Sequence, residues 1–237
     1  MLVVMMDEPF ARLGTLFSAL IVVSCAIGLT MHRDFYAGKA RKDFFCFYTN
    51  VSNLLVLVYF SLAAPRLYAR ITLHPLIPHA EFALMLSIML TFSVFHLLLF
   101  PAIRKSVAKM PHTRNYWIVC ADNFLIHYLV PWLVFAYWLL CSPGKNSLRL
   151  FDALAWTWLP VTYVLCILLR ARSGRIIEET QSPYPYPFLD IRVFGGARVF
   201  RCCVALYGLC ALAGILCLFL IRLAFLLFGG GHPLILI

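Results

Sequence analysis

The stretch that decides the fold covers residues 199–228 and reads VFRCCVALYGLCALAGILCLFLIRLAFLLF. Its only charged residues are Arg201 and Arg222, and it exceeds the roughly 20 apolar residues that cross a bilayer as a helix. Five more apolar runs precede it. The sequence therefore predicts an all-α membrane protein, a bundle of six transmembrane helices, with spans at about 10–32, 45–64, 79–101, 116–141, 151–170 and 199–228.

The composition leads to the same class of protein. Of the 237 residues, 63% are hydrophobic and 13% are charged, whereas a soluble domain is nearer half apolar and a quarter charged. Because the predicted spans use almost the whole chain, we expect one integral membrane domain, 1–237. The net charge of +10 comes from basic residues in short loops beside lipid headgroups, so we expect membrane lipids, not nucleic acid, as partners.

The distribution of Lys and Arg predicts the orientation of a multi-pass protein. Fourteen of the 20 lie in or beside the first, third and fifth loops, and six lie on the other side. Since cytoplasmic loops carry an excess of these residues, the odd-numbered loops are predicted to be cytoplasmic and both termini outside.

Two polar clusters interrupt the apolar runs. Thr49, Ser52 and Asn53 share one face of the second span, and Asn123 and His127 share one face of the fourth. Both spans start from the same side of the membrane, so a rise of about 1.5 Å per residue places Thr49 and His127 at a similar depth.

Pro131 follows His127 by four residues. Because proline has no N–H, we expect the His127 carbonyl to be free to bind another group and the span to kink there.

Threonine and histidine on facing spans can form a nucleophile and its base. The hydroxyl is weak at neutral pH and needs an imidazole within about 2.6–3.2 Å to take its proton. Asn53 or Asn123 could hold the imidazole or donate to an oxyanion, and Asp122 is a candidate orienting group. The alternative is that these residues join helices by hydrogen bonds and do no chemistry.

The fifth span and the fifth loop supply residues that could form the wall and the cap of a cavity. Trp156, Pro160 and Tyr163 share one helical face, which is either a packing stripe or one wall of a lipid-sized cavity. The proline-rich segment 182–188 cannot form regular helix, and the loop around it, including Tyr186, is expected to cap the cytoplasmic mouth.

Three further expectations concern charged groups and metals. Asp190 is expected to pair with Arg192 or another basic residue, or to act as a third catalytic member. Glu81, at the start of the third span, is expected to extend to the interface. The histidines lie in separate segments without H-x-x-x-H spacing, so we expect no metal site and no cofactor.

Four motifs resemble those of the androgen-induced-gene-like family of six-helix integral membrane proteins, most closely its bacterial branch. They are FCFYTNVSNLL at 45–55, HYLVP at 127–131, W-x-x-x-P-x-x-Y at 156–163 and YPYPFLD at 184–190. Characterised animal members are threonine hydrolases that cleave fatty acid esters of hydroxy fatty acids. The resemblance implies that Thr49 is the nucleophile and His127 the base. The segment Asn-Val-Ser-Asn after Thr49 is more polar than expected for the animal proteins, which is compatible with a different substrate or with a structural role of Thr49.

The leading hypothesis is therefore an intramembrane hydrolase of a lipid ester, such as a fatty acid ester of a hydroxy fatty acid or a related lipid. The alternatives are a lipid-binding or transport protein without chemistry, and a structural membrane partner. The transport hypothesis is weakened by the lack of matching Gly- or Pro-broken helices in two halves of the chain.

Overall fold

The structure is a computed structural model that describes residues 8–32, 42–68, 77–107, 109, 111, 113–142 and 145–228. Within these ranges the regular structure is helical, apart from one isolated bridge between Ile177 and Ser182. The elements are α1 (Glu8–His32), η2 (Phe44–Cys46), α2 (Tyr48–Tyr68), α3 (Ile77–Val94), η3 (Phe95–Leu99), α4 (Phe100–Val107), α5 (Arg114–Phe124), η4 (Leu125–Leu129), α6 (Val130–Cys141), η5 (Lys145–Ser147), α7 (Asp152–Ala155), α8 (Trp158–Ala171), η6 (Pro187–Leu189), α9 (Ile191–Phe194) and α10 (Gly196–Phe228).

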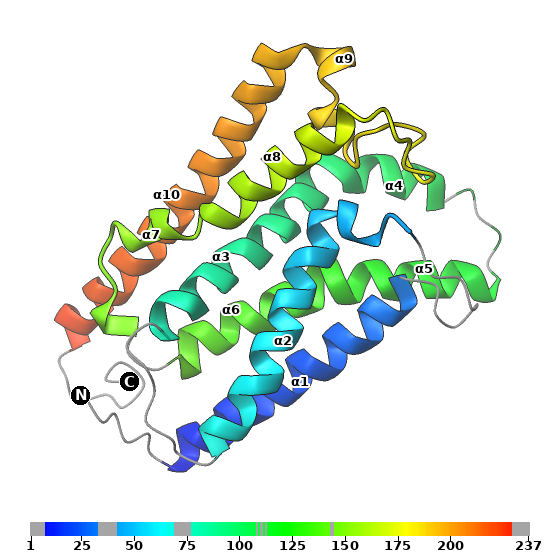
Figure 1. Cartoon of the computed structure of the whole chain (residues 1–237). Coiled ribbons are helices and arrows are strands. Elements are labelled where there is room, and N and C mark those ends of the chain that lie inside the picture. Colours follow the sequence, from blue (N-terminus) through cyan, green and yellow to red (C-terminus); the bar gives the residue numbers. More distant parts are fainter. Residues whose placement is uncertain are drawn as a thin grey trace.

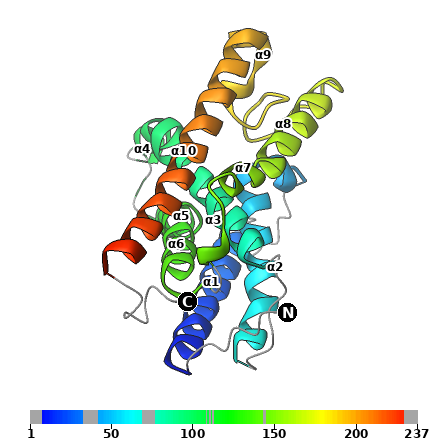
Figure 2. The same cartoon turned by 90° about the vertical axis from the view of Figure 1, so that its left-hand side faces the viewer.

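The helices run back and forth along one direction (Figure 1). A tight group is formed by α1, α2, α3 and the continuous rod α5–η4–α6, in which α1 contacts both α2 and α6. The helices α8 and α10 lie at one side of this group and are apart from each other at the end that carries α9 (Figure 2). The backbones of the last two long helices thus diverge toward that end.

The prediction of a helical, multi-pass membrane protein is confirmed. The described residues contain five helices long and apolar enough to cross a membrane: Ala11–His32, Ile77–Leu99, Arg114–Cys141, Asp152–Ala171 and Gly196–Leu223. The predicted span 45–64 is helical, but its apolar part, Tyr48–Leu62, is shorter, so the sixth crossing stays a prediction. The predicted orientation also stays a prediction, and much of the basic first loop, residues 33–41, lies outside the described residues.

Two of the long helices contain a π-helical turn, and each turn ends just before a proline. Phe95–Leu99 precedes Pro101, and Leu125–Leu129 precedes Pro131. In the second turn, the Val130 N–H donates to Leu125 O, five residues back. The Ile126 carbonyl therefore loses Val130 as its helical donor, and Pro131 cannot replace it. The carbonyl that accepts a bond from outside the helix is thus Ile126, one residue before the position that the sequence predicted.

Glu81 does not extend to the interface, so that expectation is wrong. Its carboxylate is buried and accepts hydrogen bonds from Tyr59 Oη (2.7 Å), Tyr137 Oη (3.0 Å) and Ser142 Oγ. Three hydroxyl groups supply the hydrogen bonds that the carboxylate loses when it is removed from water. Through these bonds Glu81, on α3, is joined to α2 and to the end of α6.

The close approach of α1 to the η4 turn depends on Gly28. A Cβ at this position would lie 2.5 Å from Ile126 Cγ2 and 3.2 Å from Leu125 Cβ, whereas a Cβ at Gly208 would meet nothing within 4 Å. Small residues allow membrane helices to approach in this way.

We therefore predict that Gly28→Ala destabilises the protein, because overpacking costs about 1–3 kcal/mol. Thermal unfolding in detergent should show a Tm several degrees below that of the wild type. The matched variant Gly208→Ala should keep or slightly raise the Tm, since alanine favours helix. An unchanged Tm in Gly28→Ala would show that this contact does not constrain the bundle.

Candidate functional site

A cavity of about 450 Å³ lies between α3, α8, α10 and the loop before η6. Five residues singled out from the sequence line it: Thr49, Trp156, Pro160, Tyr163 and Tyr186. The remaining lining is almost entirely aliphatic and aromatic, and its volume is in the range of small-molecule pockets. The cavity therefore suits an apolar chain whose end reaches a threonine hydroxyl.

The α10 wall of this cavity was missed in the sequence analysis. It consists of Phe200, Cys203, Val204 and Tyr207, together with Leu206. The first four follow the i, i+3, i+4, i+7 pattern of one helical face, and this spacing can be recognised in the sequence. In a span that is apolar on all sides, however, that pattern does not distinguish a cavity wall from a lipid-facing surface.

Thr49 is in the first turn of α2 and is tied to its surroundings through its carbonyl. The Ser52 Oγ donates to Thr49 O (3.1 Å) and is bonded to Thr91 Oγ1 on α3 (2.8 Å). The Asn53 Nδ2 donates to Thr49 O (2.8 Å) and also to Ile126 O (3.3 Å). The polar stripe predicted on this span thus connects α2 to α3 and to the η4 turn.

Asn53 is fully committed to this bridge. Both N–H groups of its amide are used, and its Oδ1 lies 3.6 Å from Cys25 Sγ on α1. An amide in this state has no N–H left for a developing oxyanion. Its observed contacts are those of a residue that holds Thr49 beside the turn that carries His127.

His127 is only 5% exposed, and its Nδ1 has no hydrogen-bond partner in the structure. The Phe95 ring stacks on the imidazole, with centroids 3.7 Å apart and planes at 12°, and Phe95 also lines the cavity. Among the described residues no hydrogen bond joins Thr49 to His127. The structure thus holds the two predicted catalytic side chains on neighbouring turns, with Phe95 covering one face of the imidazole.

Asp122 and Asn123 are engaged elsewhere. Asp122 Oδ2 bonds His32 Nδ1 at 2.8 Å, while its buried Oδ1 has no partner. Asn123 Nδ2 donates to Val119 O in its own helix (2.8 Å). The observed partner of Asp122 is therefore His32, at the end of α1, and not His127.

Tyr186 reaches the start of α2 from the proline-rich loop. Its Oη lies 3.5 Å from the Thr49 N–H, and its ring stacks on Phe188 (5.4 Å, 6°) and meets the edge of Phe47 (6.0 Å, 81°). Burial raises the pKa of the Tyr186 phenol, and its hydrogen bonds to Thr49 lower it in part. The phenol therefore keeps its proton at neutral pH and can act as a donor.

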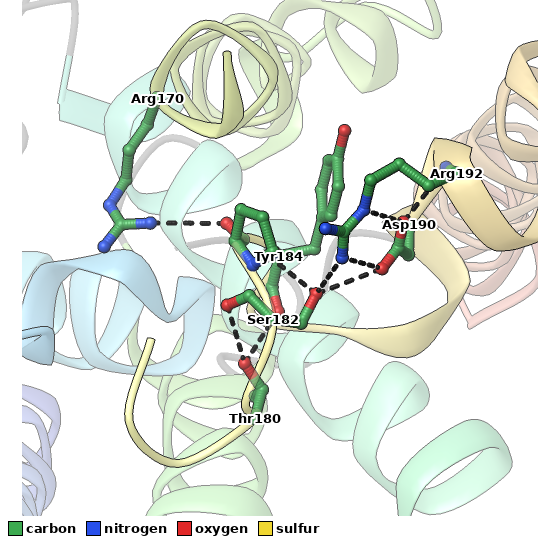
Figure 3. Close-up of polar contacts among 7 residues, drawn as sticks. Arg170, Thr180, Ser182, Tyr184, Asp190 and Arg192 are labelled. Atoms are coloured by element: carbon green, nitrogen blue, oxygen red, sulfur yellow. Dashed lines mark hydrogen bonds and ion pairs between the residues drawn. The ribbon is translucent and has the colours of Figure 1, made fainter. Parts of the chain in front are cut away.

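The loop that carries Tyr186 is fixed by a clamp around Asp190 (Figure 3). Asp190 accepts hydrogen bonds from Arg192 Nη2 (2.7 Å), Arg192 Nε (3.0 Å) and Ser182 Oγ (3.0 Å). On the opposite side of the loop, Arg170 donates to Pro183 O (3.3 Å) and pairs with Asp43 (2.9 Å). These contacts lie within the loop or join it to neighbouring elements, so the observed role of Asp190 is to hold the cap loop in position.

Comparison of the chain with protein-family models, with curated proteins and with solved structures finds no match. The described residues also contain no group of His, Cys, Asp and Glu that could hold a metal ion.

The clamp leads to a pH-dependent prediction. The guanidinium of Arg192 lowers the pKa of the Asp190 carboxyl from 3.8 to about 2. A depressed pKa stabilises the folded state above the unfolded value of 3.8, and this contribution is lost as the pH falls through about 2. Asp190→Asn should therefore lower the Tm at pH 7 by a few degrees, and the difference from wild type should shrink toward pH 2.

Thermal unfolding of both proteins between pH 7 and about pH 3 measures this difference. Glu178→Gln is the matched control, because Glu178 is exposed in the same loop, and it should leave the Tm unchanged. A difference that stays constant down to the lowest pH would contradict the assignment of the stabilisation to the Asp190 carboxylate.

Proposed function

We propose that the protein is an intramembrane hydrolase of lipid esters in which Thr49 is the nucleophile and His127 is the base. One observation carries the proposal: Thr49 lies on the wall of an apolar cavity and is bridged through a single amide nitrogen of Asn53 to the turn that holds a buried imidazole whose Nδ1 has no partner. A nucleophile needs that position.

The proposed substrate enters sideways from the bilayer. Leu165 and Val161 of α8 and Phe200 and Val204 of α10 line the cavity and are also exposed, Leu165 at 55% and Phe200 at 70%. In a membrane protein such exposed apolar surface faces lipid tails. An acyl chain can pass between α8 and α10 without crossing a polar surface, and its ester group then lies near Thr49.

The reaction runs in two halves. Thr49 Oγ attacks the ester carbonyl carbon while its proton passes to His127, and the carbonyl π electrons move to oxygen. When the tetrahedral intermediate collapses, the ester C–O bond breaks and the proton on His127 goes to the leaving alcohol. Water then attacks the acyl-threonine, gives its proton to His127, and releases the fatty acid as the threonine takes that proton back.

The imidazole reaches Thr49 directly or through one water once substrate is bound. In the proposed mechanism the Phe95 ring moves off the imidazole at this stage, because Phe95 lines the same cavity that the acyl chain fills. Catalytic hydrogen bonds are often absent in unliganded enzymes and form in the complex.

The sequence resemblance supports the same roles. The threonine and histidine motifs of the androgen-induced-gene-like family fall on Thr49 and His127, and its fifth-span motif falls on Trp156, Pro160 and Tyr163, which line the cavity. We therefore propose membership of that family. The substrate class proposed here is a long-chain ester, since an apolar cavity selects an apolar chain and not a particular alcohol.

We predict that Thr49→Ala abolishes both labelling by a fluorophosphonate probe and hydrolysis of p-nitrophenyl laurate by the purified protein in detergent. Thr49→Ser should retain labelling, because a hydroxyl remains. His127→Gln should lower the rate of both reactions by at least about 100-fold, as expected for loss of a general base. The matched control is Thr30→Ala, an exposed threonine on α1, which should behave as wild type.

Labelling and hydrolysis that survive in both Thr49→Ala and His127→Gln would refute the assignment of these two residues as the catalytic pair. Absence of both labelling and hydrolysis in the wild-type protein would refute the hydrolase, and the cavity would then be assigned to lipid binding without chemistry.

A bulky substitution that narrows the passage between α8 and α10 tests the proposed entry route. Val161→Trp should reduce hydrolysis of p-nitrophenyl laurate strongly and of p-nitrophenyl acetate little, because only the long chain needs the passage between α8 and α10. Val58→Trp, at a similarly exposed valine on α2 away from the cavity, should reduce neither. Equal losses with both esters would place the entrance elsewhere.

A further inference from the structure

The proposed reaction lacks a donor for the oxyanion. Asn53 has both N–H groups engaged, and Asn123 is bonded to Val119 within its own helix. Neither is among the cavity-lining residues, whereas the carbonyl of a bound ester must lie at the cavity wall beside Thr49. A charge that develops in an apolar cavity without donors costs several kcal/mol, so the site requires a donor from another element.

We propose that the Tyr186 phenol and the Thr49 backbone N–H together bind the oxyanion, which makes Tyr186 a third catalytic residue. This inference rests on the proposed hydrolase function. It gives the cap loop a role in the reaction itself, beyond closing the cavity.

The geometry at the start of α2 carries the inference. Thr49 is the second residue of α2, so its N–H belongs to the first turn, where helical N–H groups lack an acceptor within the helix. That N–H points to Tyr186 Oη over 3.5 Å, which is a long hydrogen bond. An anionic oxygen beside this pair, within about 2.7–3.2 Å of both donors, would take a shorter bond from each, and the Thr49 Oγ that attacks the carbonyl belongs to the same residue.

Tyr186 is held in place before any substrate binds. Its ring is fixed by Phe47 and Phe188, and its loop by the Asp190–Arg192–Ser182 clamp. A donor fixed in this way costs no reorganisation when the charge develops, which is the usual source of oxyanion stabilisation. Because burial raises the pKa of this phenol, its proton is present at neutral pH.

In the step itself, the carbonyl C=O π pair becomes a lone pair on oxygen as the Thr49 Oγ–C bond forms. The Tyr186 O–H and the Thr49 N–H donate hydrogen bonds to this oxygen and keep their protons. When the C–O bond to the alcohol breaks, the lone pair re-forms the C=O bond and the two donors are released unchanged.

The test is Tyr186→Phe, with Tyr184→Phe as the matched control. Both tyrosines are buried in the same loop, and Tyr184 Oη has no hydrogen bond in the described structure. With p-nitrophenyl laurate, Tyr186→Phe should lower kcat by about 100-fold, the usual loss for one oxyanion donor, and leave KM nearly unchanged. Tyr184→Phe should match wild type, and both variants should keep the wild-type Tm.

A second measurement separates stabilisation of the oxyanion from positioning. A dodecyl trifluoromethyl ketone forms an oxyanion adduct with an active-site hydroxyl, and its inhibition should weaken in Tyr186→Phe by the same factor as kcat. Lauric acid, which forms no adduct, should bind both proteins equally.

The outcomes distinguish the two proposals. Wild-type kcat in Tyr186→Phe, with Thr49→Ala inactive, overturns the role of Tyr186 and leaves the hydrolase intact. Equal losses in Tyr186→Phe and Tyr184→Phe overturn it as well, because the loop and not the hydroxyl would then be responsible. If turnover does not depend on Thr49, the hydrolase proposal fails, and this inference fails with it.

Discussion

The hydrogen bond from Asn53 to the Ile126 carbonyl is the constraint on which the site depends. Backbone carbonyls in a membrane must find a partner inside the protein, since each unsatisfied group costs several kcal/mol. Pro131 and the π turn before it leave Ile126 without a donor in its own helix. Asn53 supplies that donor and also binds the Thr49 carbonyl. The Ile126 carbonyl, which lacks a donor in its own helix, thus holds α2 against the rod α5–η4–α6 at the level of Thr49 and His127.

The two π turns have a common cause and a common location. Each stands just before a proline, and each carries one ring of the stacked pair Phe95 and His127. A π turn inserts one residue into the helix, so it rotates the following side chains relative to those before it. His127 lies on the π turn of the rod and is buried.

Much of the fold could be predicted from the sequence, because membrane helices must satisfy their own backbone and so follow apolar runs. The spans at 10–32, 116–141 and 199–228 appear as helices within a few residues of their predicted ends. Proline chemistry likewise predicted that 182–188 would be irregular. The carbonyl seen to accept a bond from outside the helix is that of Ile126, next to the His127 carbonyl that the sequence predicted, since the choice between an α and a π turn depends on the neighbouring helices. His32 and Asp122 pair across 90 positions of sequence, a contact with no local signal.

Glu81 and His127 show why polarity inside the membrane does not by itself identify a site. Glu81 is a buried carboxylate, yet it accepts hydrogen bonds from three hydroxyl groups, those of Tyr59 on α2, Tyr137 on α6 and Ser142 at the end of α6. A network with every member paired stabilises one arrangement and has no capacity for a ligand. At the opposite end of the bundle, the His127 Nδ1 and the Asp122 Oδ1 are buried without partners, and the first of these lies beside an apolar cavity through Phe95. Buried polar atoms without partners are costly to keep, and in the proposed mechanism the imidazole of His127 would use its lone pair to take a proton.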